Sequence, residues 1–552
     1  MTDIAKNDNI DVTISSFGYR GEGVARISGM PVFIKGALPG ERVRAHVILV
    51  KKDFAAAKLL EVLSPCADRA VPSCPLFGKC GGCDLMHLAY PAQLRFKRDA
   101  VRDALHKIAR LDPCVSDCVP SANVLGCRNK LSLPVRASAA GKAEVGLFAY
   151  NSHRVIPVYD CPLQTKRIRA LLPALHSFAN RFAPYDEASG KGELRHFVLR
   201  EFGGRLSVTF VMTRDISGRV LRSVKDSDIN ADELWININP DRTNVIMGRE
   251  TRLLDGKHED AVMTLGGRSL PVSVHPNAFY QVNDDIAAKL YSAVRGIAAA
   301  EKLDAIIDAY SGGGLMTALL SDCAPSVIGV EIEPAASSAA DELMKKAGIK
   351  NVRNILGDCA KEIPGLAGDC GENTLIVLDP PRSGCAEEVT EAVNASRARS
   401  VIYISCDPAT LARDISRMPT YTISSVTPFD MFPQTRHVET LVLLSKNSDS
   451  HINVTVEFGE GEGQISLKEV EKRAEARKPK EKVTYKMIQQ YIEENYGFKV
   501  HTAYIAEVKR SLGLPMYDAP NAVEELKQSR KHPTAEKVEA IKDALQYFGV
   551  II

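Results

Sequence analysis

The feature that most constrains the fold is an alternation of short apolar runs with helical segments from about residue 285 to 446. The runs include "AIIDA", "SVIGVEI", "TLIVLD" and "SVIYIS", and segments with helical character separate them. This rhythm predicts an α/β domain with a largely parallel sheet. Open sheets of this kind bind ligands outside the carboxyl ends of their strands, so the residues that end the runs are candidate site residues.

The first of these runs continues as "AIIDAYSGGG", in which Asp308 is followed by a glycine run and a helix. Glycines let the backbone approach a ligand, and a helix N-terminus offers free N–H groups. Glu331 ends the next run about 20 residues on, where a carboxylate accepts hydrogen bonds from ribose hydroxyls. Asp358 follows one strand later. These features predict an adenosine-containing cofactor, and they leave NAD and S-adenosylmethionine both open.

Two later runs end in Asp379 and Cys406. Asp379 opens the segment "DPPR", in which two prolines fix the turn. Methyltransferases that act on base amines end the corresponding motif in an aromatic residue, and Arg382 at this position disfavours that reaction. Glu439 precedes the final apolar run. Because free cysteines are so often buried, Cys406 alone is equally consistent with an ordinary core thiol.

The N-terminal segment, residues 9 to 63, alternates like strands and is punctuated by glycine, which predicts a small β-barrel. Interspersed Lys and Arg residues are expected on oligonucleotide-binding barrels, and the segment resembles a TRAM domain. Residues 91–111 predict an amphipathic helix with Leu94, Val101, Leu105 and Ile108 on one face and basic residues opposite.

Four cysteines have spacing typical of a metal site. Cys74, Cys80 and Cys83 form C-x5-C-x2-C, and Cys161 is a possible fourth ligand. Four thiolates bind zinc or an iron–sulfur cluster equally well by count, so spacing leaves both open.

The composition is that of a soluble globular protein. A chain of 552 residues is too long for a single hydrophobic core, so we expect several domains. The formal net charge is only +2. The N-terminus does not read as a signal or transit peptide, and no apolar run approaches the roughly 18 residues of a membrane span. We therefore expect a cytoplasmic protein whose thirteen cysteines are thiols or metal ligands.

The motifs "CPLFGKCGGC", "FYQVN", "DAYSGGG", "GVEI", "LDPPRSG", "YISCDPATLARD" and "FPQTRHVET" occur in this order. Together they resemble the RNA (uracil-5-)-methyltransferase family, in its 23S rRNA type with a TRAM domain and an iron–sulfur cluster. The resemblance covers almost all of residues 1–446, although Ser311 and Asp407 stand where the family more often has cysteine and asparagine.

The resemblance implies methylation of uracil C5 in 23S ribosomal RNA to 5-methyluridine, with S-adenosylmethionine as cofactor. Cys406 is then the nucleophile that bonds to uracil C6, Glu439 the base that removes the C5 proton, and Asp379 a partner of the uracil edge. The cofactor contacts that it implies are Gln281, Asp308, Tyr310, Gly312, Gly314, Glu331, Asp358 and Asp379. The ligands that it implies for a 4Fe–4S cluster are Cys74, Cys80, Cys83 and Cys161.

The expected architecture is multidomain. It comprises a TRAM β-barrel (1–65), a central α+β domain with the cluster and an RNA-binding surface (66–284), a Rossmann-like methyltransferase domain (285–447), a linker (448–482) and a C-terminal helical extension (483–552). We expect a monomer that takes a flipped base from a single-stranded loop and does not bind membranes. Two alternatives are a tRNA uracil-5-methyltransferase and a catalytically idle RNA-binding protein.

Overall fold

The computed structural model describes residues 4–138, 140–446, 485–496, 498–511 and 534–547. The chain divides into two compact units, Met1–Val456 and Glu457–Ile552, and each is described by itself. The expected linker at 448–482 lies outside the described residues.

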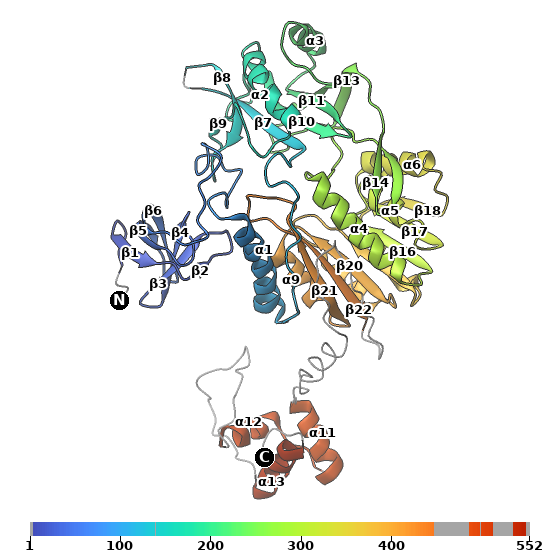
Figure 1. Ribbon diagram of the computed structural model, residues 1–552. Coiled ribbons are helices and arrows are strands. Elements are labelled where there is room, and N and C mark those ends of the chain that lie inside the picture. The colour runs from blue at the N-terminus through green and yellow to red at the C-terminus, as the bar shows by residue number, and fades with distance from the viewer. Residues whose placement is uncertain (1–3, 139, 447–484, 497, 512–533, 548–552) are drawn as a thin grey trace, which may run out of the picture. The chain divides into compact units, whose positions relative to one another are not determined.

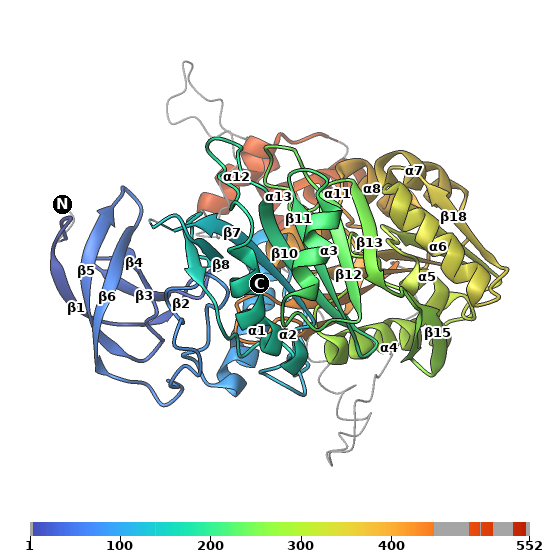
Figure 2. The ribbon, with the colours of Figure 1, turned by 90° about the horizontal axis from the view of Figure 1, so that it is seen from above.

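The N-terminal β-domain, residues 4–64, is one six-stranded sheet in the order β1-β5-β6-β4-β3-β2. Apolar side chains that alternate along its strands form a separate small core, which includes Val32, Ile34 and Val43. Figure 1 shows this domain in dark blue, and Figure 2 shows it from above. The strands are β1 (Asn9–Thr13), β2 (Ser16–Phe17), β3 (Gly23–Ile27), β4 (Met30–Lys35), β5 (Arg42–Val50) and β6 (Ala55–Ser64).

The central domain, residues 127–272, is a seven-stranded sheet in the order β13-β12-β11-β10-β7-β8-β9, followed by the hairpin β14–β15. Helix α2 packs its apolar face on this sheet and shares one core with it. The elements are β7 (Lys130–Ala137), β8 (Ala143–Phe148), β9 (Val155–Pro157), α2 (Lys166–Ala179), β10 (Leu194–Phe202), β11 (Arg205–Met212), α3 (Ser217–Lys225), β12 (Glu233–Ile238), β13 (Glu250–Gly256), β14 (Ala261–Leu265) and β15 (Arg268–Val272).

The α/β domain, residues 284–446, contains a seven-stranded sheet in the order β18-β17-β16-β19-β20-β22-β21. The five strands from β18 to β20 pair in parallel, as the sequence predicts, whereas β22 runs antiparallel to both of its neighbours. The strands are β16 (Ala305–Ala309), β17 (Ser326–Glu331), β18 (Val352–Leu356), β19 (Thr374–Leu378), β20 (Ser400–Ser405), β21 (Tyr421–Phe429) and β22 (Glu439–Lys446).

Helices cover both faces of this sheet, and each face has its own buried core. On one face lie α4 (Asp284–Ala300), α5 (Leu315–Leu320) and α6 (Pro334–Lys346). The other face is covered by α7 (Cys359–Asp369), α8 (Glu387–Ala395), α9 (Pro408–Ser416) and, from far earlier in the sequence, α1 (Tyr90–Ala104). Figure 1 shows α1 beside β21 and α9.

Two expectations for the segment 91–111 are wrong. The α-helix ends at Ala104 and continues as a π-helical turn, Leu105–Ala109. A π turn contains more residues than an α turn, which rotates Ile108 off the apolar face, and its side chain is 46% exposed. Lys97 was expected on the solvent face but is fully buried.

Lys97 is buried because it pairs with the equally buried Asp430, in the connection between β21 and β22. The Lys97 ammonium also donates to the carbonyl of Phe432 at 2.9 Å, and Tyr90 donates to the second oxygen of Asp430 at 2.8 Å. Four positions later along this connection, Gln434 exchanges hydrogen bonds with Gln93 of the same helix. Helix α1 therefore holds the segment that leads into β22.

The C-terminal unit contains α11 (Tyr485–Tyr496), α12 (Thr502–Ser511) and α13 (Ala535–Tyr547). Apolar residues of all three helices form a core of their own, with Ile492, Ile505 and Ile541 fully buried. None of the described helices in either unit is long and apolar enough to cross a membrane.

The pair Lys97–Asp430 yields a stability prediction. The substitution Lys97→Met leaves Asp430 buried without its cation, and breaking a buried pair in this way costs about 3–5 kcal/mol. We expect a clearly lower thermal unfolding midpoint, measured by calorimetry. Arg95→Gln is the matched control, because Arg95 lies on the same helix as Lys97 and its ion pair with Asp68 is half exposed. Such exposed pairs contribute less than about 1 kcal/mol. Equal midpoints for the two variants would contradict a stabilising role of the buried pair.

Candidate active site

The candidate site lies at the carboxyl edge of the α/β sheet. Parallel pairing aligns Ala309 with Leu378 and Leu378 with Tyr403, so the residues after β16, β19 and β20 lie along one edge. Because β22 runs antiparallel to β20, it begins at this same edge, and Thr440 pairs with Ser405. This register brings Glu439 beside Cys406, although 32 positions separate them in the sequence.

Cys406 is half-buried, and burial raises the pKa of its thiol to about 11. The neighbouring Glu439 carboxylate raises this pKa further, whereas the positive charge of the Arg382 guanidinium opposes the rise. Arg382 is thus the group that stabilises a thiolate at this position. In the sequence, Arg382 served only to argue against methylation of base amines. Its position shortly after Asp379, which ends a strand, was the signal that could have identified it as a site residue.

The Glu439 carboxyl is buried, and its pKa lies well above the usual value, first because of burial and then because of the Asp379 charge. Burial, with a contribution from Asp308, also raises the pKa of Asp379 to about 7. A carboxyl with a pKa of about 7, such as Asp379, exchanges protons near neutral pH. The site therefore combines a thiol with two carboxyls whose pKa values are raised.

Tyr291 of α4 is a site neighbour that sequence reasoning missed. It is 8% exposed, and the charges of Asp379, Glu439 and Asp308 together with burial raise the pKa of its hydroxyl. Its position in the apolar stripe of α4 gave no sign of polar neighbours in the sequence.

The glycine-rich loop after β16 requires unusual backbone angles. Tyr310, Gly312 and Gly314 all have positive φ, of 64°, 56° and 77°. The Gly312 N–H donates to the Glu331 carboxylate at 2.8 Å, which joins the loop to the end of β17. A side chain at Gly312 would meet no atom within 4 Å, so open space lies beside this loop, whereas a Cβ at Gly314 would lie 2.6 Å from Ala340.

The other predicted cofactor contacts lie in different surroundings. Asp308 is only 1% exposed and accepts a hydrogen bond from Thr317 at 2.6 Å. Asp358 caps α7 by accepting from the Ala360 N–H at 3.0 Å. Gln281 is buried just before α4, where its backbone carbonyl accepts from Asn129.

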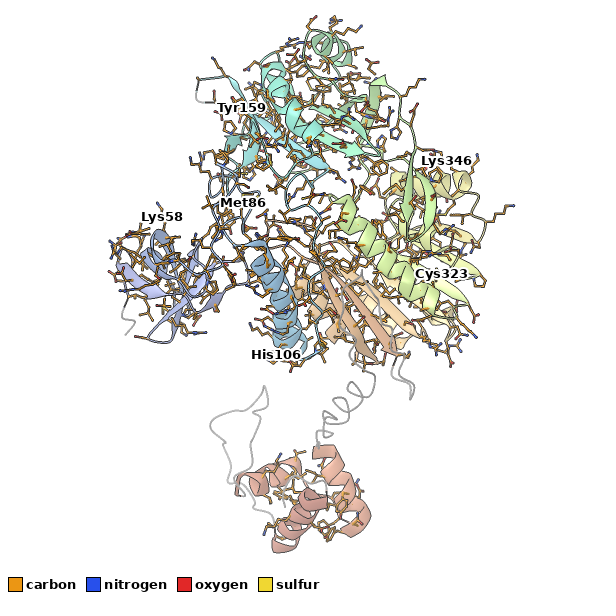
Figure 3. All side chains as sticks on the ribbon, in the orientation of Figure 1. Lys58, Met86, His106, Tyr159, Cys323 and Lys346 are labelled. Carbon is orange, nitrogen blue, oxygen red and sulfur yellow. The ribbon has the colours of Figure 1, made fainter. Side chains whose placement is uncertain are left out.

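The four predicted cluster ligands, Cys74, Cys80, Cys83 and Cys161, line one cavity of about 190 Å³. Burial raises the pKa of the Cys83 thiol to about 12 and also raises those of Cys80 and Cys161. Within the described ranges, no group of three or more His, Cys, Asp or Glu side chains is arranged to hold a metal ion. Side-chain geometry thus brings the cysteines together but does not support the predicted metal binding. Met86, which lines the same cavity, is labelled in Figure 3.

Comparisons with known proteins identify the family. Residues 202–447 match the tRNA (Uracil-5-)-methyltransferase family, and residues 6–60 match the TRAM domain. The chain is 34% identical over 455 residues to an uncharacterized RNA methyltransferase of Clostridium acetobutylicum, covering 80% of this chain and 98% of that protein. A similar protein of Halalkalibacterium halodurans is also 34% identical, over 451 residues, covering 80% of this chain and 98% of that protein.

Among solved structures, the fold is similar to that of the tRNA (uracil-54, C5)-methyltransferase of Pyrococcus abyssi in complex with S-adenosyl-L-homocysteine. The TM-score is 0.64 at 24% identity, covering 79% of this chain and 99% of that chain. The similarity to relatives over nearly their full length, together with the two domain matches, shows that this chain belongs to the tRNA (Uracil-5-)-methyltransferase family of RNA methyltransferases and carries an N-terminal TRAM domain.

Proposed function

We propose that the protein methylates C5 of a uracil in ribosomal RNA, with S-adenosylmethionine as methyl donor. The observation that carries the proposal is the contact group of Cys406, Glu439 and Arg382 at the edge of a methyltransferase sheet. An idle RNA-binding protein has no need for a buried carboxyl beside a thiol, because burying such groups costs stability.

In the proposed reaction, the Cys406 thiolate adds to uracil C6, and the Arg382 guanidinium stabilises the thiolate before attack. Electron density moves to C5, which takes the methyl group. Glu439, as carboxylate, then removes the C5 proton, and the C6–S bond breaks to return the thiolate. Asp379, at the end of the neighbouring strand β19, is proposed to hold the uracil edge.

S-adenosylmethionine supplies an electrophilic methyl group when it is bound. The residues proposed to hold it are those around the glycine-rich loop, where open space adjoins Gly312. Glu331 and Asp358 stand at the following strand ends and suit the ribose and the base. Gln281 lies at the entrance to α4 and is proposed to orient the donor toward the uracil.

A transfer RNA is the second candidate substrate. It is favoured by the fold similarity to the Pyrococcus abyssi enzyme, whose substrate is a tRNA uracil. Ribosomal RNA is favoured by the resemblance to the family type that combines a TRAM domain with the cysteine pattern of residues 74–83.

We also propose that Cys74, Cys80, Cys83 and Cys161 hold a 4Fe–4S cluster. The donor set is four thiols around one cavity, and a bound cluster would offset the cost of ionising them after burial. The cluster would join the loop of residues 74–83 to the central domain.

The substrate proposal predicts that the full-length protein with labelled S-adenosylmethionine converts uridine to 5-methyluridine in ribosomal RNA. Digestion and nucleoside mass spectrometry measure the product, and transfer RNA is tested in parallel. Cys406→Ala should abolish the product because the alanine methyl group cannot bond to C6. Methylation of transfer RNA alone would favour the second candidate, and no 5-methyluridine in either RNA would refute the proposed function.

The contact of Arg382 with Cys406 predicts a change in pH dependence. Removing the guanidinium in Arg382→Gln raises the pKa of the Cys406 thiol, so the rising limb of rate against pH moves to higher pH. At neutral pH the rate falls roughly tenfold for each unit by which that pKa rises. Arg382→Lys keeps a cation and should shift the limb less. Single-turnover rates from pH 6 to 10 provide the measurement. Because the pKa of the Cys406 thiol lies above this range, the log rate should fall by the same amount throughout and still rise with pH, and an unchanged rate would contradict this role.

The cluster proposal predicts that anaerobically purified protein is brown and contains iron and acid-labile sulfide. Cys83→Ser should lose both, because this buried thiol is one of the four that line the cavity. Cys66→Ser is the control, since Cys66 lies near the same loop but does not line the cavity. Metal analysis and the visible spectrum are the readouts, and protein that contains only zinc would refute the assignment.

A further inference from the structure

A second cleft opens beside the candidate active site, between three parts of the chain that are distant in sequence. It measures about 470 Å³, within the roughly 300–1,000 Å³ range of ligand pockets. Its walls come from the loop of residues 74–84, called here the cysteine loop, from the turn after β8 and from the α/β domain. Arg382 lines the cleft, and its charge also acts on the Cys406 thiol, so the cleft adjoins the candidate active site.

The cleft is positively charged. Arg128, Arg382 and Arg436 line it, and Asp84 is the only carboxylate among its lining residues. Asp84 is already paired with Arg436 at 3.1 Å, which leaves an excess of positive charge. Among the described residues, no carboxylate pairs with the Arg128 side chain, and its Nε is buried without a hydrogen-bond partner.

His437 also lines the cleft and is affected by the same positive charges. Burial lowers the pKa of this imidazole to about 4, and the charges that lower it further come from Arg436, Arg382, Lys97 and Arg128. An anion is therefore favoured in the cleft, and guanidinium groups bind phosphate through paired N–H donors.

An aromatic ring faces this charged cleft. Tyr150 follows β8 and lines the cleft, while the ammonium of Lys35, from the N-terminal β-domain, lies 3.2 Å from its ring centroid. The cation covers one face of the ring and holds it in place.

The cysteine loop packs against the backbone that carries this ring. The Gly81 N–H donates to the Phe148 carbonyl at 2.9 Å, and a Cβ on Gly81 would lie 3.2 Å from the Tyr150 backbone. A larger residue at this position would require the neighbouring backbone to shift by a few tenths of an ångström. The loop that carries the cluster cysteines therefore positions the tip that carries Tyr150.

We propose that this cleft binds the single-stranded RNA that flanks the target uracil, with Arg128 and Arg436 contacting phosphates and Tyr150 stacking on a base. Arginines that follow a backbone, combined with an aromatic platform, are the usual construction of a single-strand binding site. A duplex hides its base faces, so Tyr150 selects an unpaired segment. The inference rests on the proposed function, for which it names the subsite next to the reacting base.

The test measures binding of a fluorescein-labelled single-stranded deca-adenylate to the full-length protein, by anisotropy over a series of KCl concentrations. Arg128→Gln should reduce the steepness of log Kd against log salt by about 0.7, the contribution of one phosphate contact in a single strand. Tyr150→Leu should weaken binding about tenfold with an unchanged slope, because stacking is not an ionic contact. Tyr150→Phe keeps the ring and should bind like the wild type.

Two further variants sharpen the test. Asp84→Asn removes the only carboxylate lining the cleft but keeps an oxygen that accepts from Arg436, so it should strengthen binding. Arg353→Gln on β18 and Tyr159→Leu, at the exposed ring labelled in Figure 3, are matched controls and should leave Kd unchanged. Thermal unfolding of each variant confirms that it is folded.

Wild-type affinity and salt dependence in both Arg128→Gln and Tyr150→Leu would overturn the proposal, and so would equal weakening by the controls. The probe contains no uracil, and no methyl donor is added, so the result does not depend on the reaction. Binding that follows the prediction in a protein that methylates no RNA would refute the proposed function and support the cleft. An active enzyme whose variants bind the probe like the wild type would support the proposed function and refute the role of the cleft.

Discussion

The candidate site depends on one feature of the sheet, the antiparallel insertion of β22 between β20 and β21. A parallel strand in this place would put Glu439 at the opposite edge, a strand length from Cys406. The antiparallel register instead pairs Thr440 with Ser405 and brings the carboxyl to the thiol. Because strand pairing is held by a continuous ladder of hydrogen bonds, this proximity is rigid and costs no ordering when substrate binds.

The β21–β22 connection is held in turn by a helix from far earlier in the chain. Helix α1 contributes Lys97 and Gln93, which bind Asp430 and Gln434 of that connection. The N-terminal β-domain makes its own contact close by, where Tyr19 donates to Asp407, the residue after Cys406, at 3.0 Å. Asp407 uses its other oxygen to cap α9, so its carboxylate serves both contacts. Segments outside the α/β domain thus contact the residues next to Cys406 and the connection that leads to Glu439.

Burial and charge act against each other at this site. Removing Cys406 and Glu439 from water favours their neutral forms. Arg382 supplies a charge that favours the Cys406 thiolate, and the same cation contributes to the positive charge of the neighbouring cleft. On the two proposals made above, a single arginine therefore joins activation of the thiol to binding of the RNA.

The sequence by itself determined the parallel strands, the residues that end them and the cysteine pattern, because these follow from local periodicity and from spacing along the chain. It identified Cys406, Glu439, Asp379 and the glycine-rich loop as candidates. It misplaced Lys97 and Ile108, since a helical pattern reports neither a distant buried partner nor a π turn. Tyr291, the Arg382–Cys406 contact and the Lys35–Tyr150 pair were decided only by tertiary structure. These depend on strand direction and on the meeting of separate domains, which are properties of long-range packing that no local pattern in the chain records.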